Sequence, residues 1–174
     1  MKALLLTLAL ASLAAHANDD VSPRTLALHQ RLLVLDSHLD TPLQLTRPGW
    51  DITQRHDTLI DGSQVDLPRM REGGLDGGFF AIYTAQGPRD EAGLAQASAY
   101  GLATLQRIRD LIDREPQQFA LARSADDARR IAASGKRVVF ISMENAEPLA
   151  ADPGLLHTYQ RQGLSMLGLV HFAS

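Results

Sequence analysis

The chain has no cysteine among its 174 residues, few aromatic residues (5%) and no excess of charge of one sign. Without thiols it forms no disulfide bonds and has no cysteine that could accept a lipid. The 17 basic and 20 acidic residues leave a net charge of −3, which excludes a nucleic-acid binder that relies on bulk attraction to phosphate. The hydrophobic content of 45% argues against a disordered chain. The length suits a single folded domain with its own core.

The N-terminal segment has the pattern of a secretory signal peptide. Met1 and Lys2 give a short positive start, residues 3–15 form an unbroken run of small and apolar residues, and Ala15-His16-Ala17 is an A-x-A cleavage site. The run is well below the ~20 residues that a membrane-spanning helix needs. We therefore predict a signal peptide at 1–17, a mature domain at 18–174, and a periplasmic or secreted protein without a stable membrane span.

Short apolar runs alternate with amphipathic segments along the rest of the chain. The apolar runs predict strands at 33–35, 79–83, 119–122, 137–142 and 165–170. The amphipathic segments predict helices at 22–32, 90–115, 124–135 and 153–162. Residues 41–64 are polar and predict a long loop. Because the strands are continuously apolar, we expect them to be buried on both faces. The pattern predicts an α/β fold with a parallel sheet, either open or closed into a barrel.

Polar side chains follow three of these strands. His38 and Asp40 come after the first strand, Glu144 follows the strand at 137–142, and His171 ends the last one. Ligands bind at the carboxyl ends of parallel strands, so we expect these four side chains to meet. Residues two apart in an extended segment point the same way, so His38 and Asp40 would lie side by side. Imidazole and carboxylate groups are ligands that Zn²⁺ takes.

Each of these residues also has an ordinary structural explanation. An H-x-D triplet occurs in surface loops, a glutamate after a strand can cap a helix, and His171 could be a hydrogen-bonded core residue. The shared location of the four favours a metal site. The remaining histidines of the predicted mature domain follow no apolar strand and are poorer candidates: His29, His56 and His157. The chain contains no nucleophile elbow, phosphate-binding loop or H-E-x-x-H motif.

Four short blocks surround the candidate residues: VLDSHLDTP at 34–42, DLPRMREGGLDGGFF at 66–80, FISMEN at 140–145 and LGLVHF at 167–172. In this order they resemble four blocks of the membrane (renal-type) dipeptidases, peptidase family M19. Those blocks are a DGHND-P motif, an EGG turn before an aromatic strand, an S-x-E-[GN] motif and an L-T-L-x-H motif. The resemblance covers nearly all of the mature chain.

The resemblance implies the N-terminal half of a TIM-like (β/α)₈ barrel that binds two zinc ions and hydrolyses dipeptides, often with a D-residue at the C-terminal position. By motif, His38 and Asp40 would bind one zinc, Glu144 would bridge both, and His171 would contact the substrate near the scissile carbonyl. A metal-bridging water would attack that carbonyl. The partner would be a dipeptide, with no nucleic acid, and a homodimer is left open.

Two departures from the family pattern lead to further expectations. The family takes two more zinc-binding histidines, an arginine and an aspartate from its C-terminal half, whereas this sequence stops at Ser174. We therefore expect a truncated fragment, whose 174 residues alone lack dipeptidase activity. Asn145-Ala146 replaces a frequent Gly-Gly pair and could alter the loop after Glu144. Two alternatives stay open: an inactive relative that binds one metal weakly or acts by association, and a barrel amidohydrolase acting on a non-peptide amide.

Overall fold

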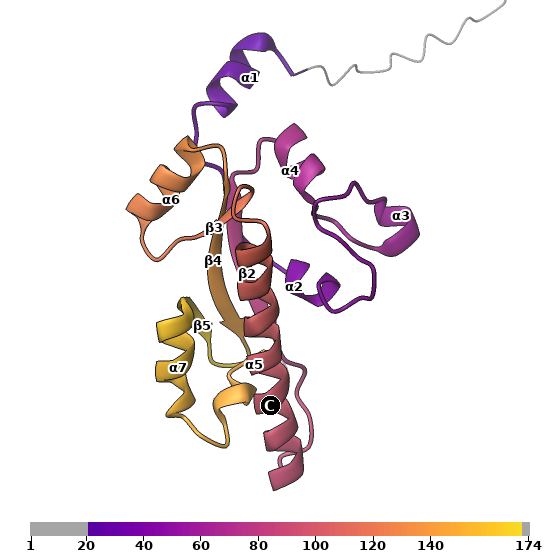
Figure 1. Cartoon of the computed structure of the whole chain (residues 1–174), viewed down its shortest axis with the longest axis vertical. Helices are drawn as coiled ribbons and strands as arrows, with labels where there is room; N and C mark the ends of the chain where they lie inside the picture. The colour runs from indigo at the N-terminus through magenta and orange to yellow at the C-terminus, as the bar shows by residue number, and fades with distance from the viewer. Residues whose placement is uncertain (1–20, 172–174) are drawn as a thin grey trace, which may run out of the picture. The chain divides into compact units, whose positions relative to one another are not determined.

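The computed structural model describes residues 21–171, so the predicted signal peptide lies outside the described part (Figure 1). The chain divides into two compact units, with the boundary after Arg31. The first unit contains α1 (Pro23–His29), which begins where the Ser22 hydroxyl accepts a hydrogen bond from the Thr25 N–H at 3.1 Å. Helix α1 ends at His29, earlier than predicted. None of the helices in the described part is long and apolar enough to cross a membrane.

The second unit is built on a parallel sheet (Figure 1). Four strands pair side by side in chain order: β1 (Leu35–Leu39), β2 (Gly77–Tyr83), β4 (Arg137–Glu144) and β5 (Leu164–Gly168). The short β3 (Phe119–Leu121) pairs with the start of β4, and β5 pairs with its end. Parallel strands in chain order, separated by helices, confirm the predicted α/β fold.

Helices connect the strands and pack against this sheet. The longest, α5 (Glu91–Arg114), begins where the Asp90 carboxylate accepts a hydrogen bond from the Gly93 N–H at 2.8 Å. Its buried residues recur every three or four positions, as predicted, and the stripe packs on the sheet. The other connections after β2 are α6 (Ala125–Ala133), the 3₁₀ turn η1 (Glu147–Leu149) and α7 (Leu155–Gln162).

The two faces of the sheet carry two separate apolar clusters. Phe80, Ile82, Val139 and Ile141 belong to the main core together with α5. The alternate residues of the same strands, Phe79, Val138 and Phe140, belong to a smaller cluster on the other face. Since successive strand residues point to opposite faces, β4 is buried on both sides along most of its length.

The predicted burial is wrong for the first and last strands. In the predicted first strand (33–35) Leu33 is exposed and the other two residues are only partly buried, and most of the predicted last strand (165–170) is exposed, including Leu169 and Val170. The described part pairs β1 with β2 alone and β5 with β4 alone, so neither strand is covered on its second side. The expectation that continuously apolar strands are buried on both faces therefore holds for the central strands and fails at the edges of the sheet.

The predicted long loop at 41–64 is also wrong in part. It contains two short helices, α2 (Thr41–Gln44) and α3 (Thr58–Asp61), and α4 (Leu67–Glu72) follows. Helix α3 forms because the Asp57 carboxylate caps the Leu59 N–H at 2.8 Å and Gly62 ends the helix in a left-handed conformation. These local caps, which the polar composition does not predict, give the segment a defined conformation.

Candidate metal centre

The structure brings the four predicted side chains together at the carboxyl ends of the strands. His38 Nε2 lies 3.3 Å from Asp40 Oδ1 and 3.1 Å from Glu144 Oε2. His171 Nε2 lies 3.1 Å from Glu144 Oε1. Glu144 is thus central, with one oxygen toward each imidazole, and its side chain is only 26% exposed. The carboxylates of Asp40 and Glu144 both lie next to His38 Nε2 and repel each other, so the arrangement favours a cation between them.

The donor set fits a zinc ion. The ligand atoms of His38, Asp40 and Glu144 all lie within 4.8 Å of one another. A tetrahedral zinc ion at ~2.1 Å from its ligands holds neighbouring donors ~3.4 Å apart, close to the observed separations of 3.3 and 3.1 Å. One imidazole nitrogen and two carboxylate oxygens leave room for a fourth ligand, as a catalytic site requires.

The local structure explains why His38 and Asp40 can act together. His38 is the fourth residue of β1, and Asp40 directly follows the strand. Leu39 between them is 3% exposed and packs in the main core. The predicted side-by-side placement is therefore observed, although β1 begins and ends later than predicted.

His171 reaches the site from beyond the end of its strand. Strand β5 ends at Gly168, so His171 lies three residues farther on. Its ring packs against Tyr83 in an edge-to-face arrangement with the centroids 5.3 Å apart. Tyr83 is the register partner of Glu144 in the β2–β4 ladder, which places its ring at the same strand end. The sequence analysis missed Tyr83 because it reads as the last apolar residue of a strand.

Asn145 accounts for the departure from the Gly-Gly pair. Its backbone has a φ of +68°, in the left-handed region that glycine and asparagine occupy more readily than other residues. Its side-chain amide also donates a hydrogen bond to the Thr84 carbonyl at 2.8 Å. The loop after Glu144 thus keeps a conformation suited to glycine and gains a contact with the segment after β2.

A cavity of about 290 Å³ opens beside the cluster. Its lining is mostly polar and comes from β1, α2 and the segment before α4: Asp36, His38, Leu39, Asp40, Thr41, Gln44, Gly62, Gln64 and Val65. The carboxylates and amides of this lining can bind ammonium and peptide groups. Asp36, Gln44 and Gln64 were not predicted, because no motif or strand end singled them out.

His56 has a structural role, in agreement with the prediction from sequence that it is a poorer candidate for a site residue. Its Nδ1 lies 2.7 Å from Asp61 Oδ2, its Nε2 lies 2.8 Å from the Asp51 carbonyl, and its ring stacks on Trp50. The buried Asp66 carboxylate accepts the His56 N–H at 2.8 Å. These contacts hold the 50–66 segment in place.

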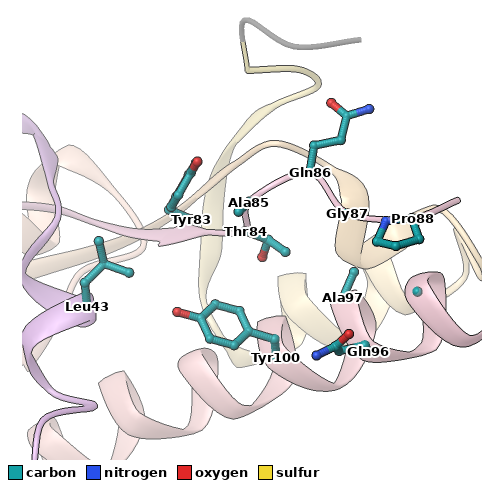
Figure 2. Close-up of a pocket in the computed structure, with 11 residues that line it drawn as sticks. Leu43, Tyr83, Thr84, Ala85, Gln86, Gly87, Pro88, Gln96, Ala97 and Tyr100 are labelled. Atoms are coloured by element: carbon teal, nitrogen blue, oxygen red, sulfur yellow. The ribbon is translucent and has the colours of Figure 1, made fainter.

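A second cavity, of about 430 Å³, lies between α5 and the segment after β2 (Figure 2). Leu43, Thr84, Ala97 and Tyr100 are among its lining residues. Figure 2 shows the Tyr83 ring on the opposite side of that segment from Tyr100. The lining includes none of the four site residues, but it includes Tyr83, whose ring packs against His171.

Comparison with known proteins places this geometry in a family. Residues 23–174 match the family model of the membrane dipeptidases, peptidase family M19. The chain belongs to this family. The dipeptidase verJ of Clonostachys rogersoniana is 26% identical over 163 residues, which are 88% of this chain and 41% of verJ. The family resemblance read from the four sequence blocks is confirmed.

Two solved structures show the same fold. The probable dipeptidase PvdM of Pseudomonas aeruginosa is 25% identical, with a TM-score of 0.75 over 87% of this chain and 39% of its own. A metallopeptidase of Rhodobacter sphaeroides, liganded with a phosphinate mimic of the dipeptide L-Ala-D-Ala, is 30% identical. Its TM-score is 0.66 over 80% of this chain and 45% of its own. The chain thus forms part of a TIM-like barrel, and it spans less than half the length of these relatives.

Proposed function

We propose that the chain carries the N-terminal part of the active site of a zinc-dependent dipeptidase. The observation that supports this most is the cluster of His38, Asp40 and Glu144, with His171 in contact with Glu144, at the strand ends of an M19 fold. Two zinc ions are proposed for the complete enzyme, with Glu144 between them. Zinc supplies a polarised scissile carbonyl and a water of lowered pKa.

The residues of this chain would divide the work according to their positions. His38 and Asp40 would hold a metal from β1 and the residue that follows it. Glu144 offers one oxygen to each side of the site, so its charge offsets repulsion between cations. We assign His171 to the substrate carbonyl, because Tyr83 holds its ring at the rim of the site, where its Nε2 would donate to that carbonyl in place of its present contact with Glu144.

The substrate proposed is a free dipeptide, including one with a D-residue at its C-terminal position. The amide side chains of Gln44 and Gln64 line the cavity beside the cluster and suit the polar groups of a short peptide. The phosphinate-liganded relative, bound to a mimic of L-Ala-D-Ala, supports the same substrate class.

The test is zinc-dependent hydrolysis of L-Ala-L-Ala and L-Ala-D-Ala, compared with N-acetyl-L-Ala-L-Ala. It is run on the 174-residue chain and on any longer product of the same reading frame, each freed of metal and reloaded with zinc. We expect turnover of the two free dipeptides by the longer product, and no appreciable turnover by the 174-residue chain. A protein that binds zinc but hydrolyses the acetylated compound equally well would be an amidohydrolase of another specificity.

We further propose that the protein is exported, on the evidence of residues 1–17. Mass spectrometry of the protein from its native host should find Asn18 as the first residue. A cytoplasmic species that retains Met1 would refute export.

A further inference from the structure

Strand β1 contains a bulge next to the metal centre. Its register pairs Asp36 with Gly78 and Leu39 with Phe80, so β1 uses one residue more than β2 between these two pairs. Ser37 and His38 together lie opposite the single residue Phe79. An extra residue of this kind bends a strand and redirects the side chains that follow it.

The bulge sets which face of the sheet each residue of β1 reaches. Leu35 and Leu39 are four apart and would share a face in a regular strand. Instead Leu35 packs with Val138 and Phe140 in the smaller cluster, whereas Leu39 packs in the main core on the other face. The shift brings Leu39 into the core and leaves His38 and Asp40 on the face of Glu144.

Asp36 forms the contact that spans this bulge. Its Oδ1 accepts a hydrogen bond from the His38 N–H at 2.9 Å. Gly78 allows the close approach, because a Cβ at that position would lie 2.5 Å from the Asp36 carbonyl oxygen and 2.9 Å from Leu39 Cδ1. The Asp36 side chain is exposed and does not belong to the three-residue ligand cluster.

We propose that Asp36 is a positioning residue of the metal centre: its carboxylate holds the bulge through the His38 N–H and so directs the His38 imidazole toward Asp40 and Glu144. The hydrogen bond from the His38 N–H, and not the negative charge of Asp36, is what positions the imidazole. The role in metal binding rests on the proposed function, whereas the role in placing His38 does not.

Three substitutions separate the bond from the charge. Asp36→Asn keeps an acceptor oxygen at the same reach and removes the charge. Asp36→Glu keeps the charge but moves the oxygens one methylene away, and Asp36→Ala removes both. The matched control is Asp152→Ala, which deletes the same kind of bond between η1 and α7, where Asp152 Oδ1 accepts a hydrogen bond from the Gly154 N–H at 2.8 Å.

The effect of each substitution is measured in two ways on the 174-residue chain. The first is NMR of the metal-free protein, with the His38 amide exchange rate and the His38 ring cross-peak as signals. The second is the zinc dissociation constant from competition with a chromophoric chelator. Circular dichroism checks that each variant folds, and the Glu variant serves if the Ala variant does not.

We expect Asp36→Ala and Asp36→Glu to shift the His38 ring cross-peak and to speed its amide exchange about fivefold, the factor for one ordinary hydrogen bond. Zinc binding should weaken about 10–100-fold, as for other supporting contacts of metal ligands. Asp36→Asn and Asp152→Ala should stay within about threefold of the unsubstituted chain, a difference below ~1 kcal/mol.

Two results would overturn the proposal. If Asn weakens zinc binding as much as Ala does, Asp36 acts through its charge. If Ala and Glu leave the His38 signals unchanged, the bulge does not depend on Asp36. A chain that binds no zinc at all would refute the proposed metal centre, while the NMR comparison would still decide whether Asp36 places His38.

Discussion

Replacing Glu144 by glutamine should damage the proposed metal centre, because Glu144 contacts both imidazoles of the site. The amide keeps the shape of the side chain but removes the charge that lies 3.1 Å from both His38 Nε2 and His171 Nε2. A unit charge pair at 4 Å and an effective dielectric constant of 20 is worth about 4 kcal/mol. A dication increases this energy, whereas solvent at a side chain that is 26% exposed and the remaining amide oxygen reduce it.

We therefore expect a loss of at least ~10²-fold in zinc affinity and in the turnover of the complete enzyme, or about 2.7 kcal/mol or more. Zinc content after dialysis and chelator competition measure the first effect, and hydrolysis of L-Ala-L-Ala measures the second. Glu91→Gln, an exposed change on α5, is the control and should alter neither. If Glu144→Gln retains its zinc and a near-normal rate, Glu144 is no more than a strand-end residue.

Other predictions concern the substrate side of the site and the segment beside it. His171→Ala should keep its zinc and lose ~10²–10³-fold in turnover, since the role proposed for its imidazole is to contact substrate rather than metal. Asp66→Ala should lower the free energy of unfolding by about 3 kcal/mol in urea titrations, because the buried carboxylate accepts hydrogen bonds from Arg69 and His56. The control, Asp126→Ala at an exposed ion pair, should lower that free energy by at most ~0.5 kcal/mol. Hydrogen bonds from Ser63 lower the pKa of Asp61 from 3.8 to about 2, so this segment should be fully stabilised above about pH 4 and lose stability toward about pH 2 in thermal melts.

The pKa of Asp66 adds to the same acid dependence. Desolvation by itself would raise that pKa, but the hydrogen bonds from the Arg69 and His56 N–H groups and from the Arg69 side chain lower it below its ordinary value. A carboxyl group with a lowered folded-state pKa stabilises the fold above its unfolded value and ceases to do so as the pH falls. A melting temperature that stays constant from about pH 5 to about pH 2 would contradict this account.

The candidate site was predictable because it depends on strand ends. His38, Asp40, Glu144 and His171 each follow an apolar run, and parallel strands bring such residues to one edge whatever their separation in sequence. The same reasoning gives no sign of the β1 bulge, since the predicted strand ends at residue 35, before the bulge begins. The bulge depends on a pairing with Gly78 that becomes apparent only when β2 lies alongside.

The 50–66 segment shows a second limit of the sequence pattern. Its polar composition predicts a loop, but Asp66 is fully buried and accepts hydrogen bonds from residues on both sides of it in sequence. Contacts of this kind join His56 and Arg69 through one carboxylate, and the spacing of apolar residues in the sequence does not predict them. Burial of a polar residue among hydrogen bonds is a tertiary property, which is why the segment was predicted to be less regular than it is.

Zinc-edge anomalous diffraction from crystals of the metal-loaded protein tests the central claim most directly, because it locates the ion without reference to activity. The account predicts a peak among His38 Nε2, Asp40 Oδ1 and Glu144 Oε2, within ~2.0–2.2 Å of each. A strong zinc peak at His56 and Asp61 with none at the strand ends, or no peak in crystals soaked in saturating zinc, would contradict it.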